Sequence, residues 1–172
     1  MKILFVDDEI ENVKNLAKKV RTFNLSVRCN FSIYLINENA DLILYKDKKE
    51  LIDIGFLEDD LQGFEINGYN NLKESLVKNS YRYDVIVFDR QLQTNERNKN
   101  GIDLLEKCLK EPNEGFLFYL VVSKEATKGA VLYDDLKRMG IDIRNYIDNT
   151  ETTSNELEKE LKCRLEYFSN HF

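Results

Sequence analysis

Two kinds of hydrophobic pattern alternate along this chain. Unbroken apolar runs, typical of strands covered by helices on both faces, predict short strands at residues 2–6, 83–88, 116–122 and, more weakly, 142–147. Apolar positions at helical spacing predict helices that end near Thr22 and Lys110, and further helices at 125–139 and 153–169. This alternation of strands and helices predicts an α/β fold with a parallel sheet and right-handed crossovers.

The stretch that follows the first predicted helix does not fit a single strand-helix unit. Residues 26–36 alternate between apolar and polar, and residues 42–45 are apolar enough to return beside them as a hairpin. We therefore assign the second strand of the sheet to 64–67 and treat about 25–62 as an inserted β-hairpin-like segment. The alternative takes 26–36 as the second strand and 41–63 as the insertion.

Composition adds a domain count and excludes several functions. The 172 residues are 42% hydrophobic and 33% charged, which predicts one domain, residues 1–172, with a sizeable core. A net charge of −6 without a Lys/Arg-rich run argues against a nucleic-acid-binding face. No apolar stretch is long enough for a membrane span and no signal peptide is recognised, so a cytoplasmic location without membrane contact is expected.

Cysteine and histidine usage narrows the chemistry further. The three cysteines, Cys29, Cys108 and Cys163, are odd in number and far apart, which indicates reduced thiols and no zinc site. The only histidine is His171, next to the last residue, so histidine-based catalysis is not expected.

Acidic side chains close two of the predicted strands. Asp7 and Asp8 follow the first strand, and Asp89 follows the strand at 83–88. Because the carboxyl ends of parallel strands meet at one crevice, these three carboxylates are expected to lie together. Their repulsion predicts either raised pKa values or a bound cation, and oxygen ligands suit Mg²⁺. The alternative for Asp7 or Asp8 is the simpler role of N-cap for the helix that follows.

Three motifs in this order resemble the receiver domain of two-component response regulators. They read KILFVDDE at 2–9, YDVIVFD at 83–89 and NGIDLL at 100–105, and Ser123 closes the strand at 116–122. The resemblance covers the chain apart from the predicted insertion. It implies a doubly wound, flavodoxin-like sheet of five parallel strands in the order 2-1-3-4-5.

The resemblance also implies roles for individual residues. Asp89 would accept a phosphoryl group from a histidine kinase or phosphotransfer protein. Asp7, Asp8 and Asp89 would hold Mg²⁺ together with the backbone carbonyl of Gln91. Ser123 would supply the hydroxyl that moves to the phosphoryl oxygens in the active form.

The chain departs from the receiver pattern at the fifth strand. Receivers usually end this strand with a lysine that pairs with the phosphoryl group, whereas here Asp148 or Asn149 takes that place, depending on register. No lysine occurs between Lys137 and Lys159. Lys124 either substitutes for the missing cation from another side or obstructs entry to the crevice.

Three functions remain from these observations. The first is a phosphoacceptor receiver without enzymatic turnover of its own, whose downstream protein binds the face at 125–169. The second is a pseudo-receiver that binds partners independently of phosphorylation, which the missing lysine favours. The third, a metal-dependent hydrolase, is weaker because the paired aspartates are adjacent at the first strand. A homodimer is compatible with the sequence.

Overall fold

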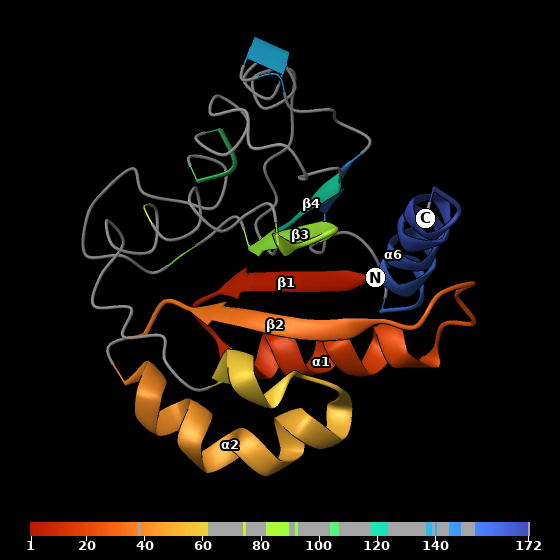
Figure 1. Cartoon of the computed structure of the whole chain (residues 1–172). Helices are drawn as coiled ribbons and strands as arrows, with labels where there is room; N and C mark the ends of the chain where they lie inside the picture. Colours follow the sequence, from red (N-terminus) through yellow and green to blue (C-terminus); the bar gives the residue numbers. More distant parts are fainter. Residues whose placement is uncertain are drawn as a thin grey trace.

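A parallel β-sheet forms the centre of the structure (Figure 1). The structure is a computed structural model that describes residues 1–37, 39–61, 74, 82–89, 92, 104–106, 118–123, 137–138, 140, 145–148 and 154–171. The strands are β1 (Lys2–Asp7), β2 (Asn30–Leu35), β3 (Val85–Asp89), β4 (Phe118–Ser123) and β5 (Tyr146–Asp148). They lie in the order β2-β1-β3-β4-β5, and every neighbouring pair is parallel. The predicted α/β class with a parallel sheet is therefore confirmed.

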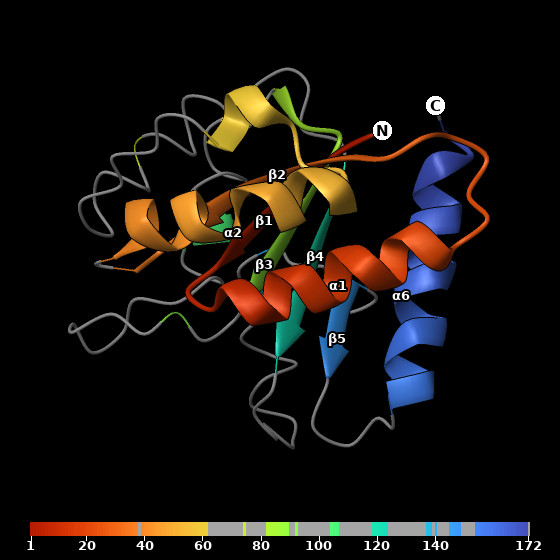
Figure 2. The same cartoon turned by 90° about the horizontal axis from the view of Figure 1, so that it is seen from below.

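Among the described residues, three helices pack on one face of this sheet. They are α1 (Ile10–Thr22), α2 (Ala40–Ile54) and α6 (Ser154–Ser169), and a short 3₁₀ helix, η1 (Glu58–Leu61), follows α2. Figure 2 shows α1 and α2 side by side, with α6 along the far side of α1. Among the described helices, none combines the length and hydropathy that a bilayer span requires.

The preferred assignment of the second strand is wrong where the structure can test it. β2 lies within 26–36 and pairs with β1 from Lys2↔Asn30 to Asp7↔Leu35, so this segment belongs to the sheet and is not a hairpin insertion. The expected return strand at 42–45 lies inside helix α2. Both faces of β2 are buried, which explains why the strand is integral to the sheet. The strand expected at 64–67 lies outside the described residues.

Helix α2 returns the chain to the outer edge of β2. Phe56 forms a parallel bridge with Phe31. The Phe31 backbone N–H donates to the Gly55 carbonyl at 3.1 Å, and the Leu57 N–H donates to the Phe31 carbonyl at 3.0 Å. Helix α2 and the residues that follow it therefore cover part of the outer edge of β2, which would otherwise expose backbone hydrogen-bond donors and acceptors.

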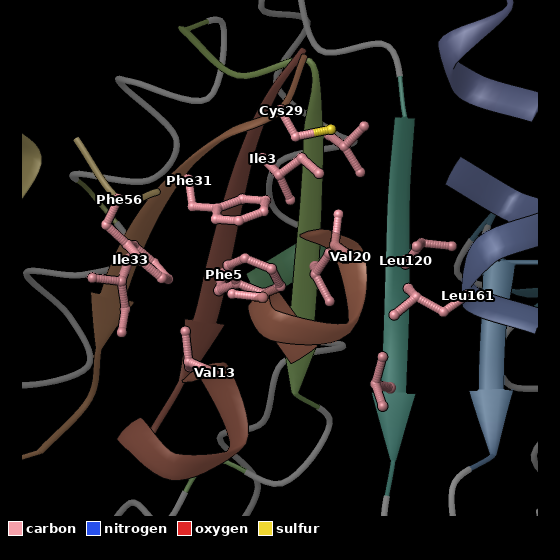
Figure 3. Close-up of a cluster of buried hydrophobic side chains, with 14 of the residues drawn as sticks. Ile3, Phe5, Val13, Val20, Cys29, Phe31, Ile33, Phe56, Leu120 and Leu161 are labelled. Carbon is pink, nitrogen blue, oxygen red and sulfur yellow. The ribbon is translucent and has the colours of Figure 1, made fainter. Parts of the chain in front are cut away.

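The core lies between the sheet and these helices (Figure 3). The rings of Phe5, Phe31 and Phe56 meet with centroids 5.5 to 6.1 Å apart. The predicted apolar face of the last helix is also buried here, through Leu157, Leu161, Leu165 and Phe168. One continuous core thus joins α1, α2 and α6 to β1 and β3, the strands that carry the acidic residues.

A Gly55→Ala substitution is expected to destabilise the fold by about 2–3 kcal/mol. Gly55 ends α2 at φ +115°, and an added Cβ would overlap the guanidinium of Arg21. Arg21 Nε donates to the Ile54 carbonyl at 2.6 Å, and its guanidinium carbon lies 4.9 Å from the centre of the Phe31 ring. The alanine variant would therefore strain the backbone and also displace the Arg21 side chain from these two contacts. Chemical denaturation measures the change in the free energy of unfolding.

Gly140→Ala is the matched control for this prediction. Gly140 also has a positive φ, +76°, but no atom of the described residues lies within 4 Å of an added Cβ. This variant should lose only about 1 kcal/mol, the conformational cost of a left-handed residue. Equal losses in the two variants would contradict the role assigned to Arg21.

Candidate metal centre

Three carboxylates converge at the carboxyl ends of two adjacent strands. Asp7 is the last residue of β1, Asp8 follows it, and Asp89 is the last residue of β3. The register pairs Val6 with Phe88, so the two strands end side by side. One carboxylate oxygen from each of the three residues lies within 4.8 Å of the other two. The structure thus brings together the side chains that the sequence places at one crevice, and their role as metal ligands remains a prediction.

The turn after β1 orients the first of these carboxylates. The strand itself is anchored by a fully buried apolar run, Ile3 to Val6. Asp7 Oδ1 accepts a hydrogen bond from the Glu9 backbone N–H at 2.8 Å, and the Asp7 carbonyl accepts one from Ile36 N–H at 2.8 Å. The N-cap of α1 is Glu9, so the expectation that Asp7 or Asp8 caps this helix is wrong.

Burial and mutual repulsion make the cluster electrostatically costly without a cation. Asp7 is 5% exposed and Asp8 is 6% exposed, whereas Asp89 is half-buried. Burial raises the pKa of Asp7 to about 8, and the charges of Asp89 and Asp8 add to the rise. Hydrogen bonds from the Glu9 N–H and the Asn12 side chain oppose it only in part. The raised pKa of Asp7 therefore reflects the cost of burying one carboxylate beside two others, and a bound cation would lower it.

This donor set fits a small, hard divalent cation. The closely spaced carboxylate oxygens are the ligands that Mg²⁺ and Mn²⁺ prefer, and a cation would offset the repulsion that raises the Asp7 pKa. Mg²⁺ is usually held by one or two carboxylates and keeps several waters, so a half-buried site with one accessible carboxylate suits it. The acidic cluster can therefore bind a divalent metal ion.

Metal-free protein is expected to lose stability as pH rises from about 4 to about 8. The folded-state pKa of Asp7 lies above its ordinary value of 3.8, so in this window the unfolded chain has already released the proton that the folded chain keeps. The loss should be on the order of 2–5 kcal/mol, and Asp7→Asn should remove it. Denaturant unfolding in the presence of a chelator, at pH 5 and pH 8, measures the difference. If the unfolding free energy changed equally between pH 5 and pH 8 in the wild type and in Asp7→Asn, the raised pKa assigned to Asp7 would be contradicted.

The other predicted site residues are placed only in part. Ser123 ends β4, one residue beyond Val122, which pairs with Asp89. In the next strand the register places Asp148 beside Ser123, so Asp148 is the residue that ends β5 there. Gln91, Lys124 and Asn149 lie outside the described residues.

Sequence reasoning missed the polar side of α1. Asn12 hydrogen-bonds with the side chain of Asp7, and Asn12, Asn15 and Lys19 line a cavity that Asp7 and Asp89 also reach. The spacing of these residues could have predicted this, because positions 12, 15 and 19 lie on one face of a helix that begins beside the acidic cluster.

Comparison with solved structures identifies the fold. The Mn²⁺-bound form of the response regulator Rcp1 aligns over 99% of this chain and 96% of its own, with a TM-score of 0.57 and 13% identity. A two-component transcriptional regulator AraC from Clostridium phytofermentans ISDg aligns over 99% of this chain and 93% of its own, with a TM-score of 0.52 and 16% identity. No protein-family model and no curated protein matches the sequence. The chain therefore has the fold of response-regulator receiver domains, as its motifs indicate.

Proposed function

We propose that this chain is a phosphoacceptor receiver of a two-component phosphorelay, phosphorylated on Asp89 in the presence of Mg²⁺. The observation that carries the proposal is the placement of three carboxylates within 4.8 Å of one another at the ends of β1 and β3. Two solved structures with this fold are response regulators, and one of them is described as Mn²⁺-bound.

Asp89 is the member of the cluster suited to attack. Its carboxylate is half-buried, whereas those of Asp7 and Asp8 are almost fully buried, so an incoming phosphoryl group reaches Asp89 first. In the transfer, an Asp89 oxygen forms a bond to phosphorus while the bond from phosphorus to the donor imidazole breaks. The imidazole nitrogen keeps the electron pair and takes up a proton.

The neighbouring residues would support this chemistry. Asp7, Asp8 and Asp89, with the backbone carbonyl of Gln91, would hold Mg²⁺, which when bound neutralises charge on the transferring group. The Ser123 hydroxyl would hydrogen-bond to the phosphoryl oxygens after transfer. Lys124 is the nearest cation in sequence to Ser123 and would substitute for the lysine that the fifth strand lacks.

The partners that follow from this proposal are proteins. A histidine kinase or phosphotransfer protein would donate the phosphoryl group, and a downstream protein would bind the face at 125–169, which includes α6. We propose a cytoplasmic location, no direct contact with nucleic acid or membrane, and no enzymatic turnover. Hydrolysis of a generic phosphate ester by the purified chain would count against the last of these.

Phosphorylation by a small donor is the direct test. The full chain is incubated with acetyl phosphate and Mg²⁺, and intact mass spectrometry should show one added phosphoryl group. Chelation of the metal should suppress the product because the clustered carboxylates then repel the donor. An unchanged mass with Mg²⁺ and with Mn²⁺ would overturn the proposal.

A second candidate is a pseudo-receiver that binds partners without phosphate. The specific observation in its favour is that Asp148, not a lysine, ends β5 beside Ser123. A further negative charge there would repel a phosphoryl group. Beryllofluoride distinguishes the two functions, because a competent receiver should respond to it in the presence of Mg²⁺ and a pseudo-receiver should not.

A further inference from the structure

A cavity of about 310 Å³ extends from the acidic cluster along α1. Its apolar walls come from three strands and the last helix, through Phe5, Val87, Val122 and Leu157. Each of these side chains is buried, so the cavity opens into the layer between the sheet and the helices. Its volume is at the lower end of the range for small-molecule sites, too small for a folded peptide segment.

The rim of the cavity is polar and carries a cation. Asn12, Asn15 and Lys19 of α1 line it at successive turns, and Leu16 lies between them. All four side chains are partly or fully exposed, so the rim faces solvent. The cavity therefore has negative charge at one end, from the carboxylates of Asp7 and Asp89, and positive charge further along α1, from the Lys19 ammonium.

We propose that this cavity binds a small organic anion with an apolar body. The anionic group would lie at the rim, where Lys19 supplies charge and the Asn15 amide supplies hydrogen bonds. The apolar body would cover Phe5, Val87 and Leu157. The opposite orientation is unfavourable because it places the anion against the carboxylates of Asp7 and Asp89.

This site goes beyond phosphotransfer, because binding here needs no phosphorylated Asp89. The two sites are nevertheless linked, since Asp7 and Asp89 belong to both. A divalent ion at the acidic cluster removes negative charge from the end of the cavity that Asp7 and Asp89 line. It should therefore tighten binding of an organic anion, and by reciprocity the anion should tighten metal binding.

Two dyes of similar shape separate the apolar contribution from the charged one. Anilinonaphthalene sulfonate has an aromatic body and one anionic group, and phenylnaphthylamine has the same body without the anion. The full chain, folded and without phosphodonor, is titrated with each dye by fluorescence and calorimetry. Both should bind at one site per chain, with the sulfonate dye tighter in Mn²⁺ than in chelator.

Variants of α1 locate the site. Lys19→Gln should weaken the sulfonate dye about threefold to tenfold and leave the neutral dye unchanged, while Lys19→Arg keeps sulfonate affinity. Lys18→Gln is the matched control, because Lys18 is the neighbouring lysine on α1 and does not line the cavity. Leu16→Trp should fill the space and block both dyes, with circular dichroism confirming the fold.

Three outcomes would overturn the inference. They are the absence of saturable binding by the wild-type chain, equal weakening by Lys18→Gln and Lys19→Gln, and unchanged affinity for both dyes in a folded Leu16→Trp variant. None of them depends on whether Asp89 can be phosphorylated, so failure here and failure of the receiver proposal are distinguishable.

Discussion

Replacing Asp89 with asparagine is expected to abolish phosphoryl transfer from acetyl phosphate, with a fall in rate of at least about a hundredfold. The amide oxygen of asparagine is a much weaker nucleophile than a carboxylate, and no other half-buried carboxylate belongs to the described cluster. The rate is measured as the appearance of phosphorylated protein by intact mass spectrometry in the presence of Mg²⁺. Peptide mapping of the wild-type product should place the modification on Asp89.

Asp84→Asn provides the control on the same segment of chain. Asp84 immediately precedes β3, at the opposite end of that strand from Asp89, and its Oδ2 accepts the Lys2 backbone N–H at 2.7 Å. This variant changes one acidic residue and should keep the wild-type rate. Similar loss in both variants would indicate damage to the fold, and wild-type labelling of Asp89→Asn would reveal a different acceptor.

The parts of the fold predicted well from sequence are those specified by local pattern. The apolar runs that end in Asp7 and Asp89 can be buried on both faces only as inner strands, and they form β1 and β3. The last helix is similarly local. It starts at Ser154, within the capping-box sequence Thr153-Ser154-Asn155-Glu156, and leucines at helical spacing form its buried stripe.

The segment from Asn30 to Ile54 could not be assigned locally. A short apolar run such as 42–45 fits a strand or a buried helix equally well, and the decision depends on what it packs against. Here Leu44, Leu51 and Ile54 share one helical face that enters the core. Because residues 42–45 belong to α2, they cannot form a hairpin with the alternating segment 26–36, and that segment supplies β2, the strand beside β1.

The properties of the site depended on distances that sequence does not give. Adjacent strand ends predicted that Asp7 and Asp89 would be close and that repulsion would raise pKa values in the absence of a cation. They did not predict that Asp7 would be almost fully buried, which is the main cause of its pKa of about 8. The cavity beside them requires α1 and α6 to stand apart at this end of the sheet. Such spacing is set by packing across many residues, so it emerges only from the folded structure.

Ion pairs centred on the buried side chain of Lys14 link α2 to α1. The Lys14 side chain is 6% exposed, and its Nζ lies 2.8 Å from Glu11, 2.9 Å from Asp47 and 2.8 Å from Glu50. Burial disfavours the ammonium, but the hydrogen bonds to these carboxylates outweigh it and raise the pKa of Lys14 above its ordinary value. The same contacts, with Lys18, lower the pKa of Glu50 to about 2.

Replacing Lys14 with methionine is therefore expected to cost about 1–3 kcal/mol of unfolding free energy, because the carboxylates left behind are partly exposed to water. Methionine fills a similar volume but leaves the carboxylates of Asp47 and Glu50 facing each other without a buried cation. Chemical denaturation at pH 7 measures the loss. Neutralising the partners in the same background, with Asp47→Asn and Glu50→Gln, should recover part of it because the repulsion is then removed.

Lys18→Met separates this effect from the general loss of a helix charge. Lys18 is 52% exposed and pairs only with Glu50 among the ion pairs of the described residues, so its replacement should cost at most about 1 kcal/mol. The stabilisation from Glu50 is present above its ordinary pKa of 4.5 and is lost as pH falls toward 2, so the difference between the two variants should shrink in acid. Equal losses at pH 7 would show that α2 is held by its apolar face alone. A larger loss of unfolding free energy for Lys14→Met than for Lys18→Met would show that the Lys14 ammonium holds α2 against α1. Because α2 leads to the segment that covers the outer edge of β2, Lys14 would then also stabilise that edge.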